Sequence, residues 1–131
     1  MKIVVSSQPP GGLDVLVDPR FGRCASFTIC EVEGNSVTNV NVIPNTAAES
    51  FSGAGIQAAQ LVANSGATIV LTGNVGPNAF TALQQLGIQI FTGVFGVTVQ
   101  AAIESYLTGT LTSTAGPTTG AKSGMGGGGR G

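Results

Sequence analysis

The chain has 131 residues, of which 42% are hydrophobic and 8% charged, and its formal net charge at pH 7 is -1. This length and composition suit one hydrophobic core rather than several. Without a basic excess or an aromatic-rich run, the sequence lacks the electrostatic footprint that nucleic-acid binding requires. The apolar stretch at Ile3–Val5 is too short for a signal peptide or a membrane span, so we expect a cytoplasmic protein without nucleic-acid or membrane partners.

The N-terminal part of the sequence predicts a strand, a long loop and a hairpin. The first strand is the β-branched run Ile3–Val5, and a loop rich in proline and glycine follows from Gln8 to Cys24. Two further runs, Phe27–Val32 and Val37–Val42, flank the sequence Glu33-Gly34-Asn35-Ser36. This spacing is typical of two antiparallel strands joined by a hairpin turn.

After the hairpin, the pattern changes to helices alternating with strands. The predicted helices are Ala54–Ser65, which places Ile56, Ala59 and Ala63 on one face, a second from Pro77 to Leu86, and Thr98–Leu107. The predicted strands between them are Thr68–Leu71 and Ile88–Phe91. Each helix is followed by a stopping glycine, which is Gly66, Gly87 or Gly109, and Thr98 can cap the third helix.

The two strand-to-helix turns of this region repeat one design. Gly66–Gly76 and Gly87–Gly96 each contain a glycine, a strand and the motif Thr-Gly-x-x-Gly before a helix. From residue 110 to residue 131 the chain is rich in threonine, serine and glycine, without apolar periodicity. We therefore expect a domain at 1–109 and a flexible tail at 110–131, and deletion after Gly109 is expected to leave thermal stability nearly unchanged.

A candidate anion site combines glycine turns with arginines. In open α/β sheets, ligands bind beyond the carboxyl ends of the parallel strands, where helix N-termini present unpaired N–H groups. Three helix starts are rich in glycine, and the segment Asp18-Pro19-Arg20-Phe21-Gly22-Arg23-Cys24 adds two arginines. Two interpretations stay open: Arg20 and Arg23 bind an anion, or they pair with Asp14 or Asp18 and hold the loop.

The titratable side chains favour a binding protein over an enzyme. The chain has no histidine, its six acidic residues are scattered, and neither glycine turn matches a nucleotide-binding fingerprint. Of the two cysteines, Cys30 is expected to be a small core residue, whereas Cys24, beside Arg23, is a candidate reactive thiol or metal ligand. A nuclease is disfavoured because metal-dependent hydrolysis needs clustered carboxylates.

Three motifs in order resemble the dinitrogenase iron-molybdenum cofactor biosynthesis family: "DPRFGR" at 18–23, "GAGIQAAQ" at 53–60 and "TGNVGPNAF" at 72–80. The resemblance covers about residues 1–109. It implies a ribonuclease-H-like α/β fold without nuclease activity, with three helices and a mixed five-stranded sheet. The implied strand order is 3-2-1-4-5, and only the second strand is antiparallel to the others. Some carriers of this family use histidine near the site, which this chain lacks.

The resemblance also implies a ligand and the residues that hold it. The ligand would be an anionic metal-sulfur cluster that contains molybdenum with iron or with copper. Carried over by motif, its binding residues are Arg20, Arg23, Gly53, Gly55, Gly73, Asn74 and Gly76. We therefore expect a non-enzymatic carrier or chaperone of such a cluster. The alternative is a module without a bound cofactor that uses the same surface to contact a protein of a redox or cluster-assembly pathway.

Overall fold

The computed structural model describes residues 1–118, which form five strands and three helices. In chain order, these are β1 (Lys2–Ser7), β2 (Ser26–Glu33), β3 (Ser36–Pro44), α1 (Ala54–Asn64), β4 (Ile69–Leu71), α2 (Pro77–Gln85), β5 (Gln89–Phe91) and α3 (Val99–Leu107). Every predicted strand and helix is present. Within this part of the chain, no helix has both the length and the apolar character needed to cross a membrane.

The strands form one mixed sheet in the order β3-β2-β1-β4-β5. β2 pairs antiparallel with both β1 and β3, whereas β1 pairs parallel with β4, and β4 with β5. The predicted fold class, strand order and single antiparallel strand are therefore confirmed. Because the parallel strands β1, β4 and β5 all end at the same edge, the loops that follow them meet there.

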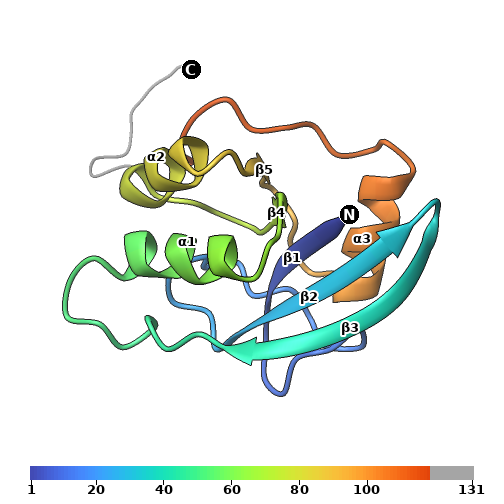
Figure 1. Cartoon of the computed structure of the whole chain (residues 1–131), viewed down its shortest axis with the longest axis horizontal. Coiled ribbons are helices and arrows are strands. Elements are labelled where there is room, and N and C mark those ends of the chain that lie inside the picture. The colour runs from blue at the N-terminus through green and yellow to red at the C-terminus, as the bar shows by residue number, and fades with distance from the viewer. Residues whose placement is uncertain (119–131) are drawn as a thin grey trace.

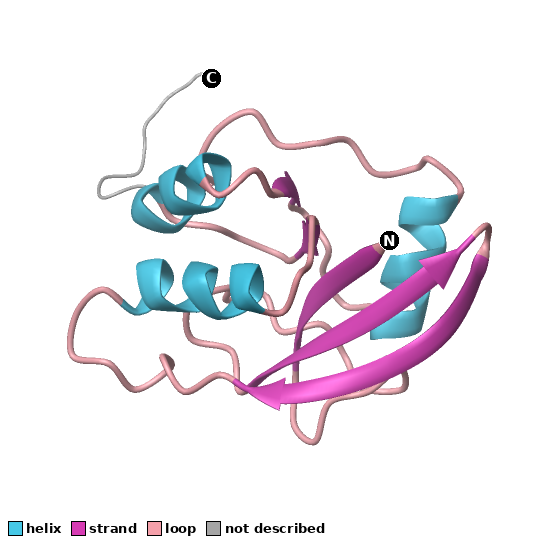
Figure 2. Cartoon of the chain, in the orientation of Figure 1, coloured by secondary structure: helices cyan, strands magenta, loops and turns pink. Residues whose placement is uncertain are grey.

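The sheet separates two layers of helices, with α1 and α2 on one face and α3 on the other (Figures 1 and 2). Successive side chains of β1 point to opposite faces of the sheet, so this one strand contributes to the hydrophobic core on each face. Val4 packs with the helices α1 and α2, whereas Ile3 and Val5 lie in the cluster that includes Ile103 of α3. Both sides of the central strand are thus fully buried, as expected for a strand covered on both faces.

The predicted inward face of α1 is partly wrong. Ala59 is buried as predicted, but Ile56 is 50% exposed, and the helix buries Ala58 and Val62 instead. The physical reason is that α1 turns the face with Ala58, Ala59 and Val62 toward the core that it shares with α2, and Ile56 lies outside this face. The remaining local expectations hold, because the Thr98 side chain caps α3 and the three stopping glycines have positive φ values.

Residues 110–118 lie against the domain and are called the C-terminal strap below. Ser113 forms an antiparallel bridge with Phe91, the Thr114 N–H donates to the Ile90 carbonyl at 2.7 Å, and Leu111 packs against the α3 core. The strap thus covers the outer edge of β5 on its way from α3 to α2 (Figure 1). Composition did not indicate these contacts, because exposed strand edges offer backbone partners that composition does not reveal. The division into a domain at 1–109 and a tail at 110–131 stays a prediction. Residues 119–131 of the expected tail lie outside the described part.

Candidate functional site: a pocket between two helix N-termini

The segment from Asp18 to Cys24 is held at the end of β1 by a buried carboxylate. The Asp18 side chain is 2% exposed. Its Oδ1 accepts from the Arg20 backbone N–H at 2.9 Å and from Arg20 Nε at 3.2 Å, and its Oδ2 accepts from Arg20 Nη2 at 3.1 Å. The hydrogen bonds and the charge of Asp18 raise the pKa of the Arg20 guanidinium. For Arg20, the structure therefore shows the ion pair that was one of the two open interpretations.

Arg20 is joined through its backbone to the turn that follows β4. It forms a parallel bridge with Asn74, and the Asn74 N–H donates to the Pro19 carbonyl at 2.8 Å. Gly73 makes this approach possible, because a Cβ atom there would lie 2.7 Å from the Cα of Pro19. Arg20, Gly73 and Asn74 thus form a contact between two loops.

Arg23 lies apart from Arg20, over the first turn of α1. Its Nη1 donates to the carbonyls of Ala48 at 2.8 Å and Ser50 at 2.9 Å, and both bonds are exposed to solvent. Within residues 1–118 the single ion pair is the one between Arg20 and Asp18, so Arg23 has no acidic partner there. Its positive charge is therefore available to an anion.

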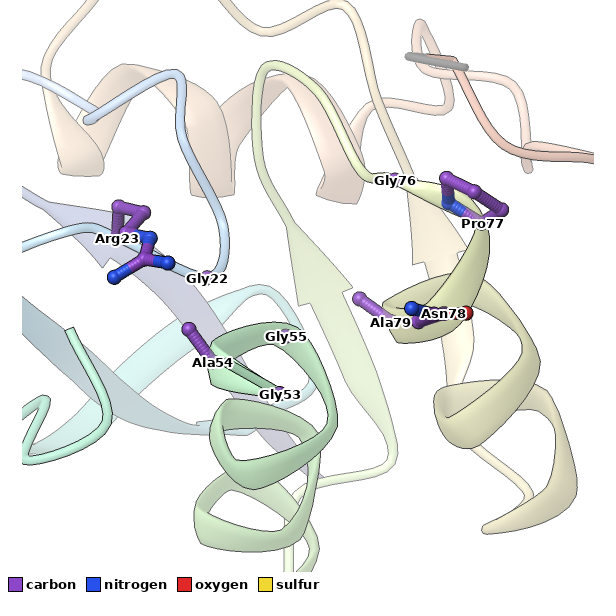
Figure 3. A pocket seen from close by; sticks show the side chains of 9 residues that line it. All are labelled: Gly22, Arg23, Gly53, Ala54, Gly55, Gly76, Pro77, Asn78 and Ala79. Atoms are coloured by element: carbon purple, nitrogen blue, oxygen red, sulfur yellow. The ribbon is translucent and has the colours of Figure 1, made fainter. Parts of the chain in front are cut away.

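An open pocket of about 250 Å³ lies between the starts of α1 and α2 (Figure 3). Its walls are very close together, because a Cβ at Gly22 would lie 3.2 Å from the Cα of Gly55, and a Cβ at Gly55 would lie 3.0 Å from the Cβ of Ala79. Small residues therefore allow the loop and the two helix starts to meet. The pocket is lined by Gly22, Arg23, Gly53, Ala54, Gly55, Gly76, Pro77, Asn78 and Ala79.

The pocket is surrounded by backbone donors without acceptors. The first helical hydrogen bonds run from the Gln57 N–H to the Gly53 carbonyl and from the Phe80 N–H to the Gly76 carbonyl. In the described part of the chain, the N–H groups of Ala54, Gly55, Asn78 and Ala79 donate to no protein acceptor. Neither helix has an acidic residue in its first turn or a side-chain cap. Two positive helix ends therefore face the same space, which suits an anion.

The third glycine-rich helix start, before α3, is closed. The Val99 N–H donates to the Val15 carbonyl at 2.9 Å, the Gln100 N–H donates to the Leu13 carbonyl at 3.0 Å, and the Ala101 N–H donates to Thr98 Oγ1 at 3.1 Å. α3 also lies on the opposite face of the sheet from α1 and α2 (Figure 1). The first turn of α3 therefore has no free donors to offer an anion.

Cys24 is fully buried and does not line the pocket. Its thiol donates to the Phe21 carbonyl at 3.3 Å. Burial, with a smaller contribution from the nearby Asp18 charge, raises the pKa of Cys24 to about 12. The thiol therefore keeps its proton at neutral pH. The role of Cys24 as a metal ligand stays a prediction, and it would require the loop to open.

The pocket brings together Arg23, Gly53, Gly55 and Gly76 of the predicted site, but not Arg20, Gly73, Asn74 or Cys24. Five further lining residues were not predicted from the sequence, although all of them lie within the motifs at 18–23, 53–60 and 72–80. They are Gly22, Ala54, Pro77, Asn78 and Ala79. Residues 1–118 contain no group of three His, Cys, Asp or Glu side chains placed to hold a metal ion. Hydrogen bonds and charge, rather than direct coordination, are what this pocket offers.

Comparison with known proteins identifies relatives of the whole domain. Residues 1–109 match the family model described as dinitrogenase iron-molybdenum cofactor. The solved structure of the apo form of the orange protein from Desulfovibrio gigas is 42% identical, with a TM-score of 0.85, over 90% of this chain and 96% of that one. The Thermotoga protein TM1290, solved by NMR, is 30% identical, with a TM-score of 0.71, over 86% of this chain and 91% of that one.

A sequence relative shares a shorter region. The uncharacterized protein MJ0580 of Methanocaldococcus jannaschii is 39% identical over 75 residues. The matched region spans 57% of this chain and 64% of that relative.

Proposed function

The chain belongs to the dinitrogenase iron-molybdenum cofactor family, and on this basis we propose that it is a non-enzymatic carrier of an anionic metal-sulfur cluster. The cluster would be a molybdenum-sulfur species, either an iron-molybdenum cofactor precursor or a molybdenum-copper cluster. The observation that carries this proposal is the pocket itself, where the free N–H groups of two helix starts converge beside Arg23. Such donors stabilise negative charge without forming a covalent bond.

The donor set suits a carrier in two further respects. Backbone N–H groups and a guanidinium hold a multiply charged anion through many weak contacts, so the anion can be released to another protein. The pocket is also open to solvent and contains no carboxylate or thiol among its lining residues. A general base for catalysis is therefore missing from this wall.

Anaerobic titration with tetrathiomolybdate, with and without copper(I), and with iron-sulfur precursors tests the proposal. Absorbance and metal counting measure uptake. Arg23→Ala is expected to weaken uptake about tenfold, because it removes a charge-assisted contact while leaving the fold intact. The matched control is Thr98→Ala, which removes the cap of the closed α3 start. It is expected to lower stability by about 1 kcal/mol and leave uptake unchanged.

Two outcomes would contradict this assignment. Equal uptake by wild type and Arg23→Ala at low salt would remove Arg23 from the site. An equal loss in Thr98→Ala would show that uptake follows general stability and not the pocket. Arg20→Ala is a separate measurement, because its ion pair with the buried Asp18 predicts a loss of folding stability. A double-mutant cycle with Asp18→Ala measures that coupling.

A second candidate function is an interaction module for a redox or cluster-assembly protein. The observation that favours it is exposed apolar surface near the pocket, since Phe51 is fully exposed and Ile56 is 50% exposed. Phe51 precedes α1 and Ile56 lies in its first turn, and other residues of that turn line the pocket. Phe51→Ser is expected to keep thiomolybdate uptake if these side chains serve a protein partner. Lack of any uptake by the wild type would favour this second function over the carrier.

A further inference from the structure

The position of Arg23 depends on two carbonyls in the loop between β3 and α1. Its Nη1 donates to the Ala48 carbonyl at 2.8 Å and to the Ser50 carbonyl at 2.9 Å. Within residues 1–118, the Nε and Nη2 groups of Arg23 donate to no protein acceptor. An arginine side chain has many rotamers, and holding it in one of them costs conformational entropy. These two carbonyls therefore decide where the guanidinium lies relative to the pocket.

A buried amide joins this loop to the segment that carries Arg23. Asn45 is 6% exposed. Its Nδ2 donates to the Gly22 carbonyl at 3.1 Å and to the Cys24 carbonyl at 3.0 Å, so it bonds to the residue on each side of Arg23. Its Oδ1 accepts from the Ala47 N–H at 3.1 Å. Both ends of the amide are thus paired, one with each loop.

The Asn45 backbone also organises the loop that holds Arg23. The Asn45 N–H donates to the Ala25 carbonyl at 3.0 Å, directly beyond the pairing of β2 with β3. The Asn45 carbonyl accepts from the Ala48 N–H at 3.1 Å, and the carbonyl of Ala48 accepts from Arg23. Asn45 therefore connects the end of the sheet, the turn at Ala48 and the segment that carries Arg23.

The same amide supports one wall of the pocket. Gly22, whose carbonyl it binds, lines the pocket (Figure 3). Gly22 lies so close to α1 that an added Cβ would be 3.2 Å from the Cα of Gly55. Asn45 itself does not line the pocket. Any influence of Asn45 on a bound anion would therefore act through Gly22 and Arg23.

Few other side chains could replace this amide. The two carbonyls that it binds need donors, and the Ala47 N–H needs an acceptor. An ionised aspartate only accepts hydrogen bonds, so it would face the two carbonyls with a negative charge. An apolar side chain would leave buried backbone groups without partners, which lowers stability. Asparagine supplies both the donor and the acceptor within this reach.

On the premise that the pocket binds an anion, we propose that Asn45 is a positioning residue of that site. It holds Gly22 and Arg23 in place in the protein without ligand, so the guanidinium is already at the pocket when the anion arrives. Less conformational entropy is then lost on binding, and the affinity is higher.

Full-length variants test this role by anaerobic titration with tetrathiomolybdate. Asn45→Ala is expected to weaken uptake about fivefold, because Arg23 must then be ordered during binding. The double variant with Asn45→Ala and Arg23→Ala is expected to bind no more weakly than Arg23→Ala alone. The NMR order parameter of the Arg23 Nε–H, measured without ligand, is expected to fall in Asn45→Ala. Asn45→Ser keeps one donor and is expected to show intermediate effects, so it replaces Asn45→Ala if that variant does not fold.

A matched control removes a buried polar group from the opposite face of the sheet. Thr28 is fully buried and lies two residues before Cys30, which belongs to the α3 core. Its Oγ1 accepts from the Gly12 N–H at 3.0 Å and donates to Ser7 Oγ at 2.9 Å. Thr28→Val is expected to lower stability and to leave both uptake and the Arg23 order parameter unchanged.

The outcomes separate this role from the function on which it rests. Absence of tetrathiomolybdate uptake by the wild type would overturn the carrier function and the role of Asn45 together. Wild-type uptake that Asn45→Ala leaves unchanged would overturn the role of Asn45 and leave the carrier function standing. Additive losses in the double variant, or an equal loss in Thr28→Val, would show that uptake follows general stability, with the same consequence. An unchanged Arg23 order parameter in Asn45→Ala would also contradict positioning.

Discussion

The turns before α2 and α3 share a sequence pattern but offer different surfaces. Each contains the motif Thr-Gly-x-x-Gly between a buried strand and a helix. At α2, the N–H groups of Asn78 and Ala79 find no acceptor in the described residues and face the α1 start across a pocket. At α3, the corresponding N–H groups of Gln100 and Ala101 donate to the Leu13 carbonyl and to Thr98 Oγ1, and the Val99 N–H donates to the Val15 carbonyl. The comparison teaches that neighbouring segments, rather than the motif, decide whether a helix start can bind an anion.

The C-terminal strap contacts both turns, so its removal is the strongest test of this comparison. A chain ending at Gly109 loses the bonds that Thr114 makes to Thr92 and that Thr118 makes to Val75, together with the packing of Leu111. We expect a loss of about 3 kcal/mol in the free energy of unfolding, because several partly buried hydrogen bonds disappear. Chemical denaturation measures this value.

The control for the strap is a chain that ends at Thr118, which keeps every described contact. It is expected to unfold at the wild-type denaturant concentration. If the chain ending at Gly109 were also as stable as wild type, the expectation from composition would be right and the strap contacts would contribute little.

The second test compares equivalent glycines of the two turns, Gly73 and Gly93. Gly73→Ala is expected to cost about 2 kcal/mol, because the new Cβ would lie 2.7 Å from the backbone of Pro19. Gly93→Ala is expected to cost about 1 kcal/mol for a different reason, since Gly93 has a φ of 82° and open space around it. Thermal denaturation of both variants compares the costs.

Substitution by asparagine distinguishes steric contact, at residue 73, from positive φ, at residue 93. It tolerates positive φ, so Gly93→Asn is expected to recover part of the stability lost in Gly93→Ala. Gly73→Asn is expected to be at least as damaging as Gly73→Ala, because its side chain meets the same atoms. Recovery at residue 73 and not at residue 93 would show that the roles of the two glycines are reversed.

The smallest expected effect is the pH dependence of stability that one buried thiol causes on each face of the sheet. Burial raises the pKa of Cys24, on the α1 and α2 face, to about 12, and that of Cys30, on the α3 face, to about 11. The thiols of the unfolded chain ionise near pH 9. The contribution of the protonated, buried thiols to the free energy of unfolding is therefore complete below pH 9 and is lost as pH rises through the folded pKa values. At pH 10, each thiol is expected to lower the free energy of unfolding by about 1 kcal/mol relative to its value below pH 9.

The variants Cys24→Ala and Cys30→Ala test whether stability falls at high pH and how much each thiol contributes to that fall. Each variant is expected to lose less stability between pH 8 and pH 10 than the wild type, as measured by urea denaturation. Rapid reaction of either native thiol with a disulfide reagent at pH 8 would contradict the burial on which the prediction depends.

Local sequence signals were sufficient to predict the strands and helices. β-branched runs, the hairpin turn at Gly34 and the helix stops at Gly66 and Gly87 are short-range features, so they predict elements directly. The strand order came from the family resemblance. The phase of α1 was harder to predict, because Ile56 is apolar and fits a helical period, and only the tertiary contacts of α1 decide that the face with Ala58 and Val62 is buried instead.

The sequence by itself determined that this protein has α/β elements, and it pointed to glycines, arginines and helix starts as a candidate anion site. The tertiary structure decided which of these meet. Arg20 turns to the buried Asp18 while Arg23 stays at the pocket, and the start of α3 is closed while those of α1 and α2 stay open. The physical reason is that each polar group takes the partner that packing brings within hydrogen-bond distance, and such partners lie far away along the chain.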